Sequence, residues 1–185
     1  MFKAFSLSIA ITFLGSAGVS YGADLDKFCK EVPNWPKGQE VPPDASYKGI
    51  AKPVDGAFTK DKWDKMKKGD KSAGKWLIID ARSKPDRSVG KVPKAALITA
   101  DYKDDSKNEF KDSILVKKIN KKLKTKYASV KDMTDVNLIV FCNGKKCHRS
   151  SFGACQLRKL GLKVDQVHVM LGGFPEWKDR GYPVR

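Results

Sequence analysis

Three of the four cysteines in the chain, Cys142, Cys147 and Cys155, lie close together near the C-terminus. A cysteine thiolate is a strong nucleophile and a carrier of sulfur, so this grouping indicates chemistry more than a scaffold of disulfides. Cys142 directly follows an apolar run, residues 137–141, that is typical of a buried strand, and a helix is expected over 150–160. We therefore expect Cys142 at the carboxyl end of a strand, where open parallel sheets bind their ligands.

The loop between this strand and the helix is polar and basic. Helix N-termini carry partial positive charge and basic side chains add to it, so we expect a lowered pKa for Cys142. Gly144 lets the loop turn back, and Ser150 or Ser151 is expected to cap the helix. The alternative is a buried structural thiol. The residues expected to cradle a bound anion are Asn143, Gly144, Lys145, Lys146, His148, Arg149 and Ser150.

Cys147 has three interpretations. It is a resolving thiol that attacks a persulfide or sulfenic acid on Cys142, half of a static disulfide that silences Cys142, or an unpaired thiol. The resolving role is favoured, because a loop thiol rarely stays unreactive in an oxidising compartment. The fourth cysteine leaves two alternatives open: Cys155 is either buried in the helix or paired with Cys29.

The loop also contains two cysteines followed by a histidine, Cys142, Cys147 and His148, which invites comparison with haem attachment or metal binding. The common haem motif has two residues between its cysteines, whereas four separate them here. His168 or Met170 would then be the second axial ligand. Zinc sites prefer shorter spacing, and no fourth ligand lies nearby in the sequence. We therefore expect no cofactor and no metal, and a colourless protein.

The rest of the chain predicts strands that alternate with helices. Thr59 is expected to cap the first helix of this series. Such alternation predicts an α/β domain with an open, mostly parallel sheet flanked by helices. The expected strands are residues 76–80, 95–99, 137–141 and 164–170, and the expected helices are residues 59–66, 110–126, 150–160 and 174–180.

Residues 1–23 predict a secretory signal peptide. Lys3 is the only charge before Asp24, the stretch 4–18 is apolar and small, and small residues surround Ala23. The alternative is a retained membrane anchor, for which this apolar run is short. We therefore expect an exported protein, in the bacterial periplasm, with no stable membrane span after signal removal.

Behind the signal peptide the sequence predicts an irregular extension over 24–55, with Trp35 and Tyr47 as candidate anchors, and one domain over 56–185. The formal net charge of the chain is +16, a balance that usually favours nucleic acid, anionic membranes or small anions. Export argues against nucleic acid, and much of the excess is expected on solvated lysine faces. Any protein partner of these faces is not indicated by the sequence.

Four motifs, in this order and spacing, resemble the rhodanese-like, or sulfurtransferase, family from about residue 56 to the end. They resemble the family's strand element with Asp-x-Arg, its downstream Gly-His-Ile-Pro-x-Ala element, its active-site strand, and its closing Gly-Gly-Phe-x-x-Trp pattern. The corresponding residues are Leu77 to Arg82, Gly90 to Ala95, Ile139 to Cys142, and Leu171 to Trp177 with Gly181 to Val184.

The resemblance implies that Cys142 accepts a sulfane sulfur from a small anionic donor such as thiosulfate and holds it as a persulfide. A thiophilic acceptor would then take the sulfur. By the same resemblance, Asp80 and Arg82 brace the sheet and the loop rather than touch substrate. Two further functions stay open, namely a non-catalytic binding module with a basic face and a dithiol redox protein that uses Cys142 and Cys147.

This sequence departs from the family at two places. The usual loop has an arginine at the fifth position after the cysteine, but here that residue is Cys147, and Arg149 follows two positions later. Lys91 also replaces the familiar histidine. Longer loops in relatives of this fold accept larger anions such as phosphate or arsenate esters. The paired cysteines resemble those of a subset of exported rhodanese-like proteins.

Overall fold

The structure is a computed structural model that describes residues 22–32, 38–40, 47, 49–70 and 74–185. Residues 1–21 of the expected signal peptide and the candidate anchor Trp35 lie outside the described residues. Within the described part of the chain, no helix has the length and apolar character needed to cross a membrane.

The centre of the fold is a five-stranded sheet in which every pair of neighbouring strands is parallel. The strand order is β1-β5-β4-β2-β3, so the expected open parallel sheet and α/β class are confirmed. The carboxyl ends of parallel strands meet at one edge of the sheet, which brings the loops that follow Asp80, Phe141 and Met170 together. The strands are β1 (Lys52–Val54), β2 (Lys75–Asp80), β3 (Ala96–Leu97), β4 (Val136–Phe141) and β5 (Val167–Met170).

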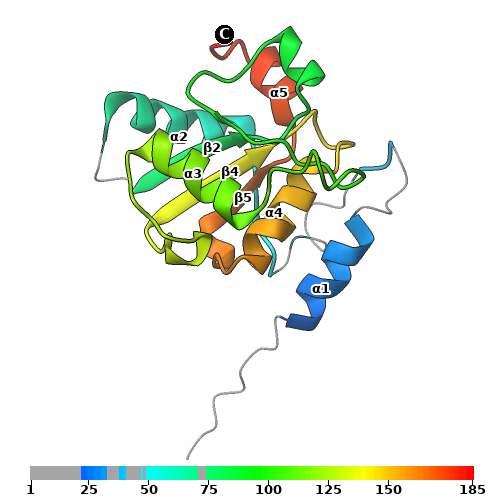
Figure 1. Cartoon of the computed structure of the whole chain (residues 1–185). Coiled ribbons are helices and arrows are strands. Elements are labelled where there is room, and N and C mark those ends of the chain that lie inside the picture. The colour runs from blue at the N-terminus through cyan, green and yellow to red at the C-terminus, as the bar shows by residue number, and fades with distance from the viewer. Residues whose placement is uncertain (1–21, 33–37, 41–46, 48, 71–73) are drawn as a thin grey trace, which may run out of the picture.

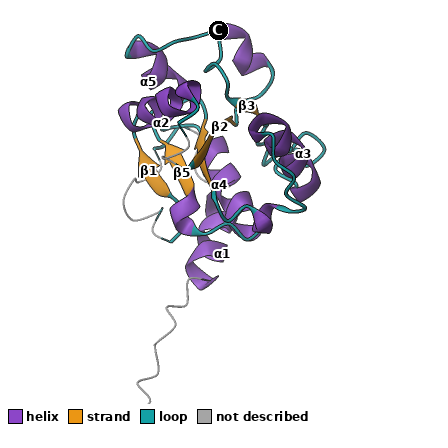
Figure 2. Ribbon diagram, turned by 90° about the vertical axis from the view of Figure 1, so that its left-hand side faces the viewer, coloured by secondary structure: helices purple, strands orange, loops and turns teal. Residues whose placement is uncertain are grey.

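Helices cover both faces of this sheet, as Figure 2 shows. Trp63 of α2 and Trp177 of α5 pack on one face against Ile78 and Ile139. Because both faces are covered, the strands consist of nearly continuous apolar runs, which is why the sequence reveals them. The α-helices are α1 (Gly22–Glu31), α2 (Gly56–Lys68), α3 (Asp112–Leu123), α4 (Arg149–Lys159) and α5 (Gly173–Asp179), and the 3-10 helices are η2 (Pro85–Val89), η3 (Val130–Asp132) and η4 (Val164–Gln166).

The opposite face carries the larger core. Leu115 and Ile119 of α3 and Leu157 of α4 pack there against the other side chains of the central strands, such as Leu77 and Leu138. All five side chains are buried. This core holds α4 against the sheet through Ala154, Cys155 and Leu157, and with it the end of the loop that follows β4.

The segment expected to be irregular, 24–55, contains helix α1 and strand β1. Figure 1 shows α1 beside α4, and a disulfide between Cys29 and Cys155 joins the two helices with a Cα–Cα distance of 5.6 Å. Cys155 is therefore paired as well as buried. Tyr47 is 2% exposed, and its ring packs 5.5 Å from the ring of Phe28.

Two expected helix caps are wrong. Helix α2 begins earlier than the sequence predicts, and Asp55 rather than Thr59 caps it by accepting a hydrogen bond from the backbone N–H of Phe58 at 2.8 Å. The earlier start is stabilised by Glu176, whose Oε1 accepts from the N–H of Gly56 at 2.8 Å. At α4 the cap position is His148 without a side-chain cap, because both expected serines lie inside the helix.

Candidate active site

Cys142 is the first residue after β4, and it is 1% exposed. Its position is fixed on both sides by main-chain hydrogen bonds. The carbonyl of Phe141 accepts from the N–H of Ala81 at 2.9 Å, and the carbonyl of Cys142 accepts from the N–H of Phe174 at 2.8 Å. The cysteine is thus held between the loop after β2 and the start of α5.

Two glycines let the chain fold tightly around this cysteine. Gly144 has a φ of +103° and Gly173 a φ of +60°, both in the region that glycine tolerates best. A Cβ atom on Gly173 would collide with the carbonyl oxygen of Cys142 and the backbone N of Gly144. The expected turn at Gly144 is present, and its carbonyl accepts from the N–H of Cys147 at 2.9 Å. Only glycine at position 173 allows this approach.

The Cys142 sulfur contacts one group of its own loop and one group of α4. Its thiol donates to the carbonyl oxygen of Cys147 at 2.7 Å, and the hydroxyl of Ser150 lies 3.2 Å from the sulfur. Ser150 is therefore placed against the sulfur instead of capping α4. Cys142 and Cys147 are both free thiols, and Cys147 is the more exposed of the two.

The two thiols differ strongly in acidity. Burial raises the pKa of the Cys142 thiol well above its ordinary value, and the neighbouring Cys147 raises it further. A hydrogen bond between the two side chains lowers the pKa of the Cys147 thiol to about 6, and nearby backbone N–H groups and the charge of Arg149 lower it further. The expectation of a lowered pKa at Cys142 is wrong, because that thiol is buried beneath its own loop. Cys147 is the thiol that loses its proton first.

Arg149 and Asn143 both contact an acidic residue that the sequence analysis did not single out. Nη1 of Arg149 donates to Oδ2 of Asp86 at 2.7 Å, and the Asn143 side chain bonds to the same carboxylate. Burial acts to raise the pKa of Asp86, but the Ser83 hydrogen bond and the Arg149 charge hold it below its ordinary value. The arginine expected to cradle an anion is thus already engaged in an ion pair.

The other basic residues of the loop contact solvent or the N-terminal segment. Lys145 is 59% exposed, and its Nζ lies 4.0 Å from Oε2 of Glu40. Lys146 is also exposed. His148 is buried, with its Nε2 at 3.2 Å from the carbonyl oxygen of Gln39. The structure therefore brings Cys147 and Ser150 to Cys142, and it sets Lys145, Lys146 and His148 against solvent and the N-terminal segment.

Asp80 and Arg82 form a buried ion pair at the carboxyl end of β2. Both side chains are fully buried, and Nη2 of Arg82 donates to Oδ2 of Asp80 at 2.7 Å. The guanidinium also donates to the carbonyls of Asp86 at 3.1 Å and Gly90 at 2.7 Å, and it lies 3.9 Å from the ring centre of Phe174. This arginine therefore joins β2, η2 and α5 through its contacts.

Sequence reasoning missed two partners of the site. Asp86 lies in a polar connection, and nothing in the sequence connects it with Arg149. Tyr47 was a candidate anchor, but its partner was not foreseen: the tyrosine hydroxyl bonds to the hydroxyl of Ser151, the residue next to Ser150. Burial raises the pKa of Tyr47 strongly, so this hydroxyl keeps its proton at neutral pH.

The sequence contains two candidate features for metal or haem binding, the loop with Cys142, Cys147 and His148 and the candidate axial ligand His168. No group of three or more His, Cys, Asp or Glu side chains among the described residues could hold a metal ion. His168 packs between aromatic rings, with centroid distances of 5.6 Å to Phe58 and 5.0 Å to Trp76.

Comparison with known proteins identifies the family. The model of the rhodanese-like domain matches residues 61–180, more than half of the chain, and the chain belongs to this family. The chain has no match among curated proteins. The structural matches include thiosulfate sulfurtransferase from Pseudomonas aeruginosa, with 14% identity, a TM-score of 0.49, and coverage of 88% of this chain and 23% of that one.

Two other solved structures match over most of their own length. A rhodanese-related protein from Thermoplasma volcanium has 19% identity and a TM-score of 0.41, with coverage of 71% of this chain and 95% of that one. A protein from Rhodopseudomonas palustris described as a possible tyrosine phosphatase has 17% identity and a TM-score of 0.44, with coverage of 97% and 100%. The family assignment rests on the family model.

Proposed function

We propose that this protein transfers sulfane sulfur through a persulfide on Cys142. The observation that carries the proposal is the position of a free thiol at the end of β4 in a rhodanese-like domain, in contact with Cys147 and Ser150. A cysteine nucleophile divides sulfur transfer into two steps, with the sulfur held covalently between them. The donor is a small anion of the thiosulfate class, and the acceptor is a thiophilic anion.

In the first step, the Cys142 sulfur attacks the outer sulfur of the donor. A Cys142–S bond forms, the bond between the two donor sulfurs breaks, and sulfite leaves with the electron pair of that bond. The proton of Cys142 goes to the thiolate of Cys147, whose pKa of about 6 makes it the ionised thiol of the pair at neutral pH. The products are a Cys142 persulfide anion, a Cys147 thiol and sulfite, so atoms and charge balance.

In the second step, the thiophilic anion attacks the outer sulfur of the persulfide. The bond to the Cys142 sulfur breaks, and Cys142 leaves as a thiolate that takes back the proton of Cys147. Ser150 supports both steps, because its hydroxyl lies 3.2 Å from the Cys142 sulfur and can donate to a negative charge there. The pair of thiols returns to its starting state.

Export to an oxidising compartment is part of the proposal, with residues 1–23 as the cleaved signal peptide. The disulfide between Cys29 and Cys155 supports it, since such bonds persist outside the cytosol and are rare within it. Both cysteines lie C-terminal to the proposed cleavage point, so the mature protein would keep the disulfide.

Steady-state sulfur transfer from thiosulfate to a thiophilic acceptor tests the proposal. Cys142→Ser is expected to lower kcat/KM below detection, because it removes the sulfur carrier. Cys147→Ser is expected to lower it only in part, since Cys147 accepts a proton without carrying sulfur. Full activity of the Cys142→Ser variant, with the fold retained by circular dichroism, contradicts the proposal.

A second function, dithiol redox exchange, is favoured by one observation. Cys147 has a pKa of about 6 and contacts the free thiol of Cys142, an arrangement that suits thiol–disulfide exchange. Here Cys142 and the thiolate of Cys147 would form a disulfide and pass two electrons and one proton to an oxidising partner disulfide, which leaves as one thiol and one thiolate. Equilibration with glutathione buffers distinguishes this function, because it requires a reversible disulfide between these two residues, whereas sulfur transfer does not.

A further inference from the structure

A cavity lined mostly by basic side chains lies apart from the Cys142 loop, between η2, the edge strand β3 and helix α3. Its volume is about 320 Å³. Four of the lining residues are basic and one is acidic, and none belongs to the loop 142–150. The lining residues are Lys84, Arg87, Ser88, Lys91, Leu97, Glu109 and Lys118.

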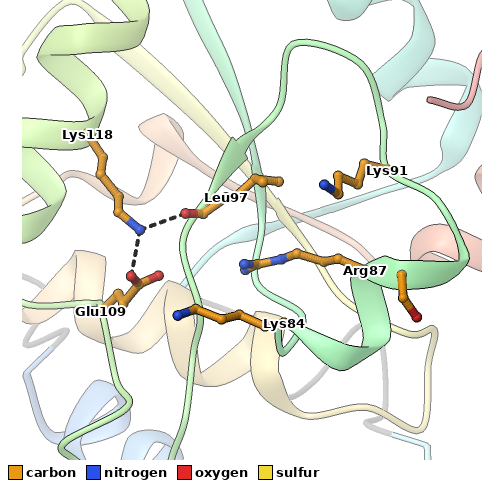
Figure 3. A pocket seen from close by; sticks show the side chains of 7 residues that line it. Lys84, Arg87, Lys91, Leu97, Glu109 and Lys118 are labelled. Carbon is orange, nitrogen blue, oxygen red and sulfur yellow. Dashed lines mark hydrogen bonds and ion pairs between the residues drawn. The ribbon is translucent and has the colours of Figure 1, made fainter.

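The single acid of the cavity is already used by the protein. Oε1 of Glu109 pairs with Nζ of Lys118 at 2.7 Å, and Oε2 accepts from the N–H of Thr99 at 2.7 Å. Nζ of Lys118 also donates to the carbonyl of Leu97 at 2.8 Å, and Figure 3 shows both contacts of this lysine. Among the described residues, Glu109 therefore forms its ion pair with Lys118 and not with Lys84, Arg87 or Lys91.

Arg87 is the buried member of this set. It is 6% exposed, and its Nη2 donates to the carbonyl of Asp80 at 2.7 Å. Its Nε is buried without a hydrogen bond, at 3.8 Å from Oδ1 of Asp80. That carboxylate is already held by Arg82, so one acid serves two guanidinium groups. Burial of this charge is costly and lowers the pKa of Arg87, while the charges of Asp80, Glu109 and Asp86 act in the opposite direction.

Two lysines complete the excess charge. Neither Lys84 nor Lys91 forms an ion pair with another described residue. Figure 3 shows their side chains and that of Arg87 extending toward the side of the cavity where Lys118 and Glu109 lie. An anion between them would gain three cationic contacts, and charge-assisted hydrogen bonds of this kind are about twice as strong as neutral ones.

We propose that this cavity binds a small tetrahedral oxyanion, a sulfur or phosphorus oxyanion, through Lys84, Arg87 and Lys91. The volume suits an anion of this size with its remaining water, and the ring of donors suits an acceptor with oxygens in several directions. The site is separate from the sulfur chemistry at Cys142 and does not depend on it.

Isothermal titration with sulfate and, in a separate arm, phosphate tests the site, each against chloride at the same ionic strength. The Lys84→Gln, Lys91→Gln double variant is expected to raise the Kd of the bound anion at least about tenfold, which corresponds to about 1.4 kcal/mol. The matched control is Lys121→Gln with Lys126→Gln, which removes the same charge from exposed positions outside the cavity. The arm with the lower Kd in the wild-type protein identifies the sulfur or the phosphorus oxyanion as the ligand.

Two results would overturn the proposal. One is a wild-type protein that binds neither sulfate nor phosphate more tightly than chloride. The other is an equal loss of affinity in the cavity variant and the control variant, which would assign binding to overall charge. Circular dichroism of both variants ensures that the comparison is made between folded proteins.

Discussion

Arg149, the first residue of α4, forms an ion pair with Asp86 of η2 at a distance of 2.7 Å between Nη1 and Oδ2. This contact connects the loop of Cys142 with the segment that follows β2. The Ser83 hydroxyl and the Asn143 side chain bond to the same carboxylate. Asp86 therefore contacts both ends of the Cys142 loop, Asn143 at its start and Arg149 at its end. Asp86 is thus a positioning residue for the candidate active site.

The Asp86→Asn variant is expected to lower kcat/KM for sulfur transfer by about tenfold, because the loop loses the charge that holds Arg149. Its free energy of unfolding should change by only about 1 kcal/mol or less, since both side chains are about 30% exposed. Asp105→Asn is the control, because it removes a similar carboxylate that pairs with Lys111 at the surface. Equal effects of the two substitutions on kcat/KM would contradict the positioning role.

The acidity of Cys147 predicts the pH dependence of alkylation. Thiolates react with iodoacetamide and thiols do not, so labelling of Cys147 should rise with pH through about 6. Cys142 should label only at much higher pH, because burial raises its pKa. Peptide mapping after short exposures measures both rates. Faster labelling of Cys142 than of Cys147 at pH 7 would reverse the assignment.

We expect a substitution of Gly173 by alanine to disturb the candidate active site sterically. In Gly173→Ala the left-handed backbone costs about 1–2 kcal/mol, and the collision with the Cys142 carbonyl adds about 1–3 kcal/mol. Gly181→Ala is a matched control, since its φ is +68° but nothing lies within 4 Å of its added Cβ. Urea unfolding should show the larger loss for Gly173→Ala, and only this variant should lose activity. Similar losses in both variants would contradict the close approach.

The disulfide between Cys29 and Cys155 joins α1 to α4, and we expect it to contribute to the free energy of unfolding of the protein. Cys29→Ser with Cys155→Ser should lower the free energy of unfolding by about 2–4 kcal/mol, because the bond closes a loop of 126 residues. Urea titration with and without a reductant measures the effect. The wild-type protein should lose this stability when reduced, whereas the double variant should be insensitive to the reductant. A reductant effect in the double variant would assign the stability to other cysteines.

Strands β2, β4 and β5 and the position of Cys142 could be predicted because these strands are covered on both faces and are mostly apolar. Strand β1 was not expected, and residues 164–166 of the expected strand 164–170 form η4 instead. The helix caps could not be predicted, since Asp55 and Thr59 are both good capping residues. A distant contact decides between them: Glu176 binds the N–H of Gly56 and so extends α2 by a turn.

The motif predicted which residues lie in the loop after Cys142, but their contacts could not be predicted. The motif around Cys142 indicates which residues lie in the loop, yet not which way Lys145 and His148 point. That direction depends on Glu40 and Gln39, which contact the loop from a distant part of the chain. The acidity of the two thiols likewise depends on burial, which no local pattern contains.

The most direct test of sulfur transfer is mass spectrometry of the intact protein, reduced and then treated with thiosulfate, with the modified peptide mapped. A persulfide mechanism predicts a species one sulfur atom heavier, with the added sulfur on Cys142 and absent from the Cys142→Ser variant. Loss of two hydrogens across Cys142 and Cys147, with no added sulfur, would contradict that mechanism and favour dithiol redox exchange.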